Sequence, residues 1–339
     1  MAERFGLGVV GAGMAAKPHF RSLADLEGLI EVRGVFTRSA ETRARVAAET
    51  GFPAAASLDA LIEDPKVDAL LVMTPPDSRA EIVARATSAG KSLLVEKPLE
   101  RDAAAAARIV EVAEKAGAPL GVIFQNRFRR AATALRETLD AGDLGPILSV
   151  VLDVPWWRPQ SYYDQPGRGT RARDGGGVLI TQAIHALDLM LWMTGPAAEA
   201  QAMAGTTRHR METEDFAAGA VRFASGALGS VMATTSAYPG GPDVLTLHCR
   251  NAVARLANGT LRIERLEGGV EEIGEEAVSG FGADPMAFPH DWHRAQIAEF
   301  VEAVRAGRPP LSNGRSALDV HRLIDAMLRS SETGRRAPV

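Results

Sequence analysis

Residues 5–16 read FGLGVVGAGMAA, and this stretch decides the fold of the first part of the chain. It opens with a short apolar run, which predicts a buried parallel strand. Gly11 and Gly13 follow directly, and a helical pattern then continues toward Leu26. In a G-x-G-x-x-A turn the first glycine permits a tight bend, the second admits a pyrophosphate, and Ala16 lets the helix pack closely on the strand. The stretch therefore predicts a dinucleotide-binding fold.

The predicted phosphate contacts are the loop residues Gly11, Gly13, Met14 and Ala15. The first turn of a helix offers free backbone N–H groups and the positive end of the helix dipole, and both attract phosphate. A glycine pattern alone is a weak signal. Its position between a strand and a helix strengthens it.

Strand and helix patterns alternate through residues 1–124. Further strands are predicted at residues 31–36, 67–73, 92–95 and 120–124, and helices at residues 40–49, 58–63, 77–89 and 102–116. This alternation is typical of an α/β domain with a doubly wound parallel sheet, the Rossmann fold. The ligand of such a sheet lies beyond the carboxyl ends of the strands, so residues at those ends are candidate contacts.

Thr37 and Arg38 follow the second predicted strand, where NAD-binding folds usually carry Asp or Glu for the ribose 2′-hydroxyl. A hydroxyl and a guanidinium suit a 2′-phosphate, which a carboxylate would repel. We therefore expect NADP to be preferred over NAD. The alternative is a solvated Arg38 and a site that accepts either cofactor.

Two later strand ends also carry candidate residues. Thr74, Pro75 and Pro76 form a stiff loop that we expect to pass near the dinucleotide. Glu96 and Lys97 precede a proline at the next strand end, and we expect both to lie beside the cofactor. A lysine near a nicotinamide can polarise a substrate oxygen or shuttle protons. The alternative is a surface lysine that pairs with the neighbouring carboxylate.

Residues 174–195 read DGGGVLITQAIHALDLMLWMTG, three glycines followed by an apolar helical pattern. At helical spacing Thr181, His185 and Asp188 share one face. Polar groups on a buried helix need partners or line a pocket, so His185 is a candidate catalytic base and Thr181 a candidate neighbour. The alternative is a core histidine whose nitrogens are satisfied by hydrogen bonds.

The loop before this helix, residues 156–173, is rich in aromatic and cationic groups. Aromatic faces, hydroxyls and guanidinium groups suit a sugar or an anionic sugar derivative. Arg158, Tyr163 and Arg168, with Gln182 and His185, are therefore the predicted substrate contacts. The alternative is an ordered surface or subunit-contact loop.

Residues 125–339 are predicted to form a second, α+β domain with a large open, mostly antiparallel sheet. A strand at residues 147–154 is predicted to start this sheet. After residue 195 the pattern changes to period two, with strands predicted at residues 199–204, 215–223, 227–235, 244–249, 252–256 and 261–265 and hairpin turns at Ser225-Gly226 and Asn258-Gly259. Helices within about residues 292–331 are expected to pack back on the first domain. Alternating apolar positions on both faces of the sheet favour a homodimer or homotetramer formed through it.

Composition excludes several classes of protein. The net charge of −4 offers no basic field for nucleic acid or an anionic membrane, and no apolar run has the length of a membrane span. Cys249 is the sole cysteine, which fits a reducing compartment and predicts a cytoplasmic protein. No metal site is expected, because His290, His293 and His321 lack metal-ligand spacing with any carboxylate pair.

The order GxGxxA, TPPD, EKP and GGG…H-x-x-D resembles the Gfo/Idh/MocA oxidoreductases, named after glucose–fructose oxidoreductase, inositol dehydrogenase and a rhizopine-catabolism enzyme. The resemblance covers nearly the whole chain. It implies that Lys97 and His185 are a catalytic pair that faces the nicotinamide. Two positions depart from the family: Thr181 stands where many members have Asp or Asn, and Arg79 where many have His.

The resemblance implies an NAD(P)-dependent dehydrogenase that moves hydride between the nicotinamide and a secondary carbinol of a sugar, a cyclic polyol or a sugar derivative. Alternatives within the family are a trans-dihydrodiol dehydrogenase, a glycoside hydrolase that retains its nucleotide and a regulator that binds a dinucleotide without chemistry.

Overall fold

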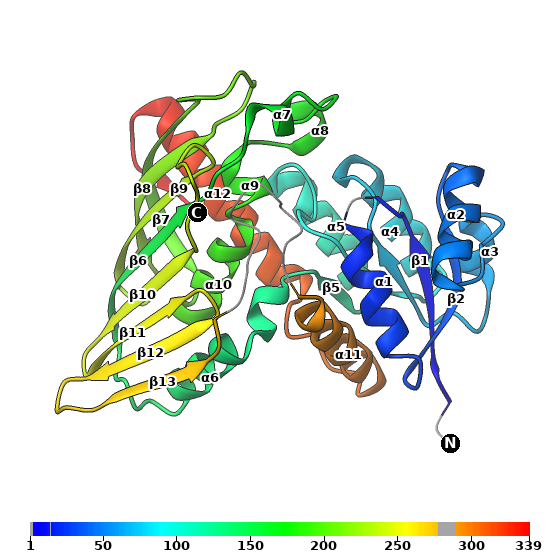
Figure 1. The fold of residues 1–339 in the computed structure, drawn as a ribbon, viewed down its shortest axis with the longest axis horizontal. Helices are drawn as coiled ribbons and strands as arrows, with labels where there is room; N and C mark the ends of the chain where they lie inside the picture. The colour runs from blue at the N-terminus through cyan, green and yellow to red at the C-terminus, as the bar shows by residue number, and fades with distance from the viewer. Residues whose placement is uncertain (1–2, 14, 277–288) are drawn as a thin grey trace. The chain divides into compact units, whose positions relative to one another are not determined.

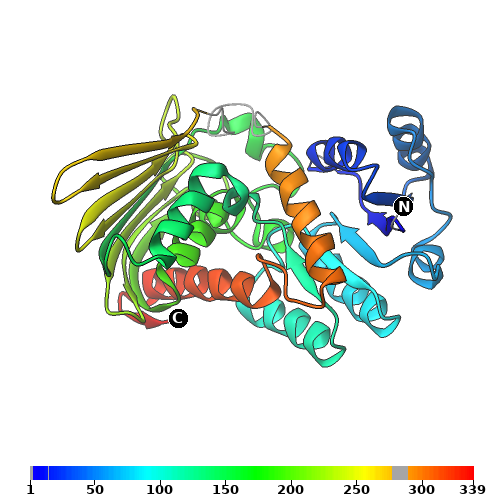
Figure 2. The ribbon, with the colours of Figure 1, turned by 90° about the horizontal axis from the view of Figure 1, so that it is seen from below.

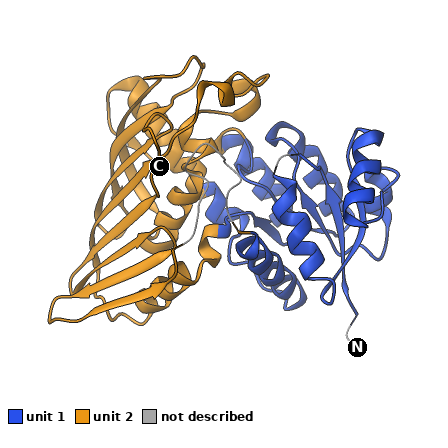
Figure 3. Cartoon of the chain, viewed as in Figure 1, with its two compact units in different colours: residues 1–100, 104–125, 290–318 blue, residues 101–103, 126–289, 319–339 orange. Residues whose placement is uncertain are grey.

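The computed structural model describes residues 3–13, 15–276 and 289–339. The chain divides into two compact units (Figures 1 and 3). The first unit contains residues 1–100, 104–125 and 290–318, and the second contains residues 101–103, 126–289 and 319–339. A segment near the C-terminus therefore belongs with the N-terminal sheet.

The first unit is built on a five-stranded parallel sheet in the order β2-β1-β3-β4-β5. The strands are β1 (Phe5–Val10), β2 (Ile30–Phe36), β3 (Ala69–Val72), β4 (Ser92–Val95) and β5 (Leu120–Val122). The strand order reverses between β1 and β3, and ligands of doubly wound sheets bind at such a switch point. The predicted parallel α/β sheet is confirmed.

Helices cover both faces of this sheet (Figure 2). They are α1 (Ala16–Asp25), α2 (Ala40–Thr50), α3 (Leu58–Glu63), α4 (Arg79–Ser88), α5 (Ala103–Lys115) and α11 (Asp291–Arg305), with a short 3₁₀ turn, η1 (Pro76–Ser78). Helix α1 packs against α11, and Ile297 and Phe300 of α11 are buried in one core cluster with Val9 and Leu71 of the sheet. Residues 290–318 thus complete the core of the first unit.

The second unit is built on a nine-stranded sheet in the order β13-β12-β11-β10-β6-β9-β8-β7-β14. Only β6 and β9 pair in parallel, so the predicted mostly antiparallel sheet is confirmed. Two of the strands, β13 and β14, were not predicted from the sequence pattern. The strands are β6 (Ile147–Pro155), β7 (Ala197–Gly205), β8 (Phe216–Phe223), β9 (Leu228–Thr234), β10 (Val244–Cys249), β11 (Ala252–Ala257), β12 (Thr260–Arg265), β13 (Val270–Gly274) and β14 (Ala337–Pro338).

One face of this sheet is covered by α6 (Arg130–Asp140), α10 (Ile184–Thr194) and α12 (Gly314–Thr333) (Figure 2). Side chains directed to that face are buried, as the alternation along β6 and β10 shows. On the other face Val151, Met203, Leu228 and Val253 are exposed. The second unit therefore has one packed and one open sheet face.

The predicted single helix over residues 174–195 is broken. It consists of α8 (Arg171–Asp174), α9 (Val178–Thr181) and α10, with a 52° bend between the part ending at Thr181 and α10. The Thr181 hydroxyl donates to the carbonyl of Gly177 over 2.6 Å, a local bond that competes with regular helix. The expectation that Thr181 shares a helix face with His185 is therefore wrong. His185 and Asp188 do lie together, in α10.

No single helix among the described residues is long and apolar enough to span a membrane. The bent pair formed by residues 171–181 and α10 meets the criteria of length and composition only when taken together.

Candidate functional site

The glycine turn after β1 has the geometry that its sequence predicts. Gly11 has φ +100°, and a Cβ there would lie 2.9 Å from the backbone carbon of Met73, so only glycine fits. A Cβ built on Gly13 would have no atom of the described residues within 4 Å, its chain neighbours aside. Helix α1 begins at Ala16 without a side-chain cap, and the Ala16 N–H donates to the Gly13 carbonyl over 3.1 Å, so the glycine turn leads directly into the positive end of the helix. Met14, the fourth predicted contact, lies outside the described residues.

The ends of β1 and β2 lie side by side, since the Gly11 N–H donates to the Phe36 carbonyl over 2.8 Å. Thr37 follows at once, and its hydroxyl donates to the Ser39 carbonyl over 2.9 Å. Arg38 is exposed, and it makes no hydrogen bond or ion pair with any described residue, so its guanidinium is available to a ligand. The predicted 2′-phosphate contact is thus beside the glycine turn.

The Thr74–Pro76 loop follows β3 at the switch point. The Thr74 backbone N lies 3.1 Å from a Cβ built on Gly11, so this loop adjoins the glycine turn. Thr74 Oγ1 is buried and has no hydrogen-bond partner among the described residues. A buried hydroxyl without a partner is unusual in a folded protein and marks a place for a ligand contact. The residues present therefore fit a dinucleotide at this edge.

Arg79, the first residue of α4, joins this loop to the turn at residues 96–98, which we call the Lys97 turn. It is only 2% exposed, and its guanidinium donates to the carbonyl of Thr74 (2.7 and 3.0 Å) and to the carbonyls of Glu96 and Pro98. Burial lowers the pKa of Arg79 to about 10, so it is still charged at neutral pH. The arginine that departs from the family pattern is thus a structural link between the Thr74–Pro76 loop and the turn at residues 96–98.

Lys97 is half-buried at the carboxyl end of β4. Its backbone N–H donates to Glu96 Oε2 over 3.0 Å. Glu96 itself is buried, and its other carboxylate oxygen lies 2.7 Å from His19 Nε2. The carboxylate of Glu96 is therefore engaged within the protein. Its predicted contact with the cofactor stays a prediction, and these bonds favour a supporting role.

His19, Glu96 and His293 form a cluster that the sequence pattern did not predict. Their potential ligand atoms lie within 4.8 Å of one another, and all three residues are buried. The imidazole rings of His19 and His293 meet edge to face, with centroids 4.8 Å apart. Burial lowers the pKa of His293 to about 3, so this imidazole is neutral. The sequence signal that could have indicated this cluster is His19, a polar residue on the buried side of α1 between Ala16 and Leu23.

In the second unit, Trp156, Arg158, Tyr162 and Arg168 form an aromatic–arginine cluster. The Arg158 guanidinium lies 5.3 Å from the Trp156 ring centre and 5.7 Å from that of Tyr162, and Arg168 lies 4.8 Å from the Tyr162 ring centre. These are cation–π distances. Trp156 Nε1 is buried without a hydrogen-bond partner among the described residues. The structure thus brings Arg158 and Arg168 together on Tyr162, which the sequence analysis had not singled out.

Gln182 and Thr181 extend this cluster. The Gln182 amide donates to the Tyr162 hydroxyl over 3.3 Å, and the Thr181 hydroxyl contacts Gln182 Oε1 and the Gly177 carbonyl. A hydroxyl has one proton to donate and cannot serve both acceptors at full strength. The Thr181 hydroxyl is therefore already engaged within its own segment.

Tyr163 has a different environment from its neighbour. It is 6% exposed, its hydroxyl is 2.7 Å from Thr235 Oγ1, and its ring lies 4.6 Å from that of His209. Burial raises the pKa of Tyr163. His209 in turn contacts the carboxylate of Asp215 (2.8 Å) and the carbonyl of Arg158 (2.9 Å). Tyr163 thus anchors the loop, and its predicted contact with substrate stays a prediction.

His185 is partly exposed in the first turn of α10, and Asp188 is fully buried one turn later. The Asp188 carboxylate receives two bonds from Arg127, from Nε over 2.8 Å and from Nη2 over 2.5 Å. Burial raises the pKa of Asp188, and the Arg127 charge opposes that rise. Asp188 therefore fixes α10 to the segment that follows β5.

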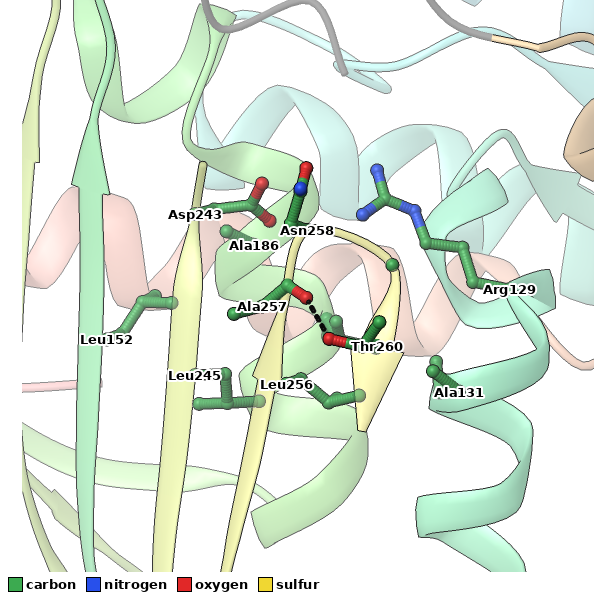
Figure 4. A pocket seen from close by; sticks show the side chains of 13 residues that line it. Arg129, Ala131, Leu152, Ala186, Asp243, Leu245, Leu256, Ala257, Asn258 and Thr260 are labelled. Carbon is green, nitrogen blue, oxygen red and sulfur yellow. Dashed lines mark hydrogen bonds between the residues drawn. The ribbon is translucent and has the colours of Figure 1, made fainter. Parts of the chain in front are cut away.

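A separate pocket lies within the second unit, between α6, α10 and the β10–β12 hairpins (Figure 4). Arg129 and Asp243 stand on opposite sides of it, and the Thr260 hydroxyl donates to the Ala257 carbonyl at its rim over 2.8 Å. None of the predicted site residues lines this pocket.

Two family models match this chain, and they cover most of its length. The model for the oxidoreductase family with an NAD-binding Rossmann fold matches residues 5–124, and that for the GFO/IDH/MocA C-terminal domain matches residues 132–255. A dTDP-3,4-didehydro-2,6-dideoxy-alpha-D-glucose 3-reductase of Streptomyces violaceoruber is 32% identical, over 94% of this chain and 87% of its own. The chain belongs to the Gfo/Idh/MocA family. The predicted resemblance is confirmed.

Other relatives agree with this assignment. The rhizopine catabolism protein MocA of Rhizobium meliloti is 28% identical, over 90% of this chain and 88% of its own. The WlbA dehydrogenase of Bordetella pertussis, solved with NADH and UDP-GlcNAcA, is 27% identical with a TM-score of 0.83, over 99% of both chains. A levoglucosan dehydrogenase, 20% identical over 99% of both chains, has the same fold with a TM-score of 0.90.

Membership settles the general activity. This Gfo/Idh/MocA protein is an NAD(P)-dependent oxidoreductase of the sugar and polyol dehydrogenase type, and its first unit is the NAD-binding Rossmann fold of the family.

Proposed function

We propose that this protein transfers hydride between NAD(P) and a secondary carbinol of a sugar, cyclic polyol or sugar derivative. The observation that carries the proposal is the Lys97 turn, in which Glu96 and Arg79 hold the backbone around Lys97 at the carboxyl end of β4 in a parallel sheet. The nicotinamide supplies hydride acceptance and donation when bound. The first unit is assigned to the cofactor and the second to the substrate.

Lys97 and His185 are proposed as the proton-transfer pair. In the direction of oxidation, His185 takes the hydroxyl proton of the substrate. The Lys97 ammonium donates a hydrogen bond to the same oxygen and stabilises the negative charge that develops on it. Thr181 is proposed as a neighbour that fixes Gln182, since its hydroxyl contacts that side chain rather than replacing a carboxylate.

We propose an anionic or nucleotide-linked sugar as the substrate class. The aromatic–arginine cluster combines ring faces with two guanidinium groups, and such a surface suits a sugar that carries carboxylate or phosphate. A dTDP-sugar reductase and a dehydrogenase solved with UDP-GlcNAcA are among the relatives. Arg168 is the proposed anion contact, because it stands over Tyr162 with 17% of its side chain exposed.

A preference for NADP over NAD is part of the proposal. It is supported by Arg38, whose exposed guanidinium follows the strand that neighbours the glycine turn. We further propose that two copies of the chain associate through the open sheet face, where Val151, Met203 and Leu228 are exposed. Sedimentation velocity of the full chain measures this association.

Two variants test the catalytic pair. Lys97→Met and His185→Asn are each expected to lower kcat by about 10²-fold or more, because each removes a proton-transfer group. The affinity for NADPH, measured by fluorescence titration, should change less than threefold. Lys91→Met is a matched control, since Lys91 is buried and donates to the carbonyls of Asp64 and Val67, away from the turn.

The activity assay follows nicotinamide absorbance with a panel of sugars, polyols and nucleoside-diphosphate sugars. Near-full activity in both variants contradicts the pair. Release of nitrophenol from a nitrophenyl glycoside without net reduction of the cofactor would instead support a hydrolase.

A further inference from the structure

The Lys97 turn rests on a buried pair of groups that the proposed reaction does not use. His19 of α1 is 0% exposed and Glu96 is 7% exposed. One oxygen of the Glu96 carboxylate lies 2.7 Å from His19 Nε2, and the other accepts the Lys97 backbone N–H over 3.0 Å. A single carboxylate therefore connects the helix that follows the glycine turn to the residue proposed for catalysis.

The charge state of Glu96 makes this connection specific. Burial alone would raise the pKa of Glu96, but the hydrogen bond from His19, together with the charge of Lys97, brings it below its ordinary value. The carboxylate is therefore ionised, and a buried carboxylate needs a donor at each oxygen. His19 supplies one donor and the Lys97 amide supplies the other.

This bond fixes the protonation of His19. An ionised carboxylate only accepts hydrogen bonds, so His19 must carry its proton on Nε2. His19 Nδ1 is buried with no partner among the described residues. The hydrogen bond from Nε2 to Glu96 is therefore the one that the imidazole makes within this part of the chain. Arg79 donates hydrogen bonds to the carbonyls of Glu96 and Pro98. The backbone on either side of Lys97 is thus held at its N–H and at its carbonyls.

We propose that His19 is a positioning residue: it holds the Glu96 carboxylate against the Lys97 amide and thereby sets the place of the Lys97 ammonium. The effect on turnover rests on the proposed function, whereas the effect on the turn itself does not.

A metal ion is the competing explanation for the same cluster, since His19, Glu96 and His293 are all ligand types. Two ligand atoms on a tetrahedral zinc lie about 3.3 Å apart, given bonds of about 2.0–2.1 Å. The His19–Glu96 distance is 2.7 Å, which is a hydrogen-bond length. The geometry therefore favours a direct bond between imidazole and carboxylate.

The chain offers a direct measurement of the turn, because it has only five lysines: Lys17, Lys66, Lys91, Lys97 and Lys115. Labelling the full chain with ¹⁵N-lysine gives five amide signals, and Lys97→Arg identifies the one of interest. Hydrogen exchange of this amide reports the bond to Glu96. The ratio of its rate to that of the Lys91 amide removes any change in global stability.

Three substitutions separate the bond from general packing. His19→Gln keeps an amide N–H near the position of Nε2, His19→Asn is polar but reaches only the position of Nδ1, and His19→Leu keeps volume alone. We expect the exchange ratio to rise at least tenfold in His19→Asn and His19→Leu, and less than threefold in His19→Gln. The value of kcat should fall about tenfold in the same two variants, with KM and the NADPH affinity within about threefold.

The outcomes are distinguishable. An unchanged exchange ratio in His19→Leu, or equal ratios in His19→Gln and His19→Asn, overturns the proposal. Zinc bound at one ion per chain by the wild type and lost in His19→Gln also overturns it. If the exchange ratios follow the prediction while kcat does not, the positioning of the turn stands and the catalytic role of Lys97 falls.

Discussion

The glycine turn of the first unit and the aromatic–arginine cluster of the second unit expose different parts of their residues, backbone in one case and side chains in the other. The first is mainly backbone: Gly11 can hold no side chain, and the space around Gly13 is open. The second consists of side chains, with two guanidinium groups at cation–π distance from the Tyr162 ring. A backbone site is specified by a few adjacent residues, whereas a side-chain site needs supports from distant segments.

The buried Arg127–Asp188 ion pair of the second unit should be the interaction most sensitive to a single substitution. Asp188→Ala leaves the Arg127 guanidinium buried without its carboxylate, so we expect the free energy of unfolding to fall by about 3–5 kcal/mol. Urea denaturation measures this change. The double variant Arg127→Met/Asp188→Leu removes both charges and should cost less than Asp188→Ala alone. If Asp188→Ala lowers the free energy of unfolding by less than about 1 kcal/mol, the second unit does not depend on this ion pair as the comparison requires.

Two alanine substitutions should separate the roles of the glycines in the first unit. Gly11→Ala forces a side chain into a left-handed conformation against Met73, so we expect a loss of about 1–3 kcal/mol in stability. Gly13→Ala has room for its Cβ and should unfold like the wild type, yet bind NADPH about tenfold more weakly, because the Cβ stands where the phosphates approach. Equal stability of the two variants would contradict this account.

The smallest expected effect is at the rim of the cofactor edge. Arg38→Ala should weaken NADPH binding about tenfold, through loss of a charged hydrogen bond to the 2′-phosphate, and leave NADH within about twofold. Arg45→Ala is the control, since this residue of α2 pairs with Glu49. Fluorescence titration with both nucleotides gives the ratio. Equal losses for the two nucleotides would remove Arg38 from the proposed contacts.

Local sequence patterns were sufficient to predict most of the helices and strands. The limits of α3 (Leu58–Glu63), β4 (Ser92–Val95) and β10 (Val244–Cys249) agree with the predicted ranges, because apolar periodicity and flanking turns define them. The short β14 was missed because two residues show no period. It is a strand only through pairing with β7.

Long-range contacts explain the remaining differences. Residues 174–195 have the composition of one helix, but a Cβ on Gly177 would lie 1.8 Å from the Glu214 carbonyl, and the Glu214 carboxylate accepts N–H bonds at the start of α9. The break between α8 and α9 thus depends on a residue far along the chain. The His19–Glu96 bond was missed for the same reason, since 77 positions separate the two residues.

The return of residues 290–318 to the first unit bears on the order in which the protein matures during synthesis. Ile297, Phe300 and Val301 complete a core whose other members come from β1, α1 and β3. A ribosome that has released only the five strands of the first sheet has not yet made this part of the core. The core of the first sheet is completed only after residues 126–289 of the second unit have been synthesised. Most of the second unit is thus made before the core of the first unit is complete.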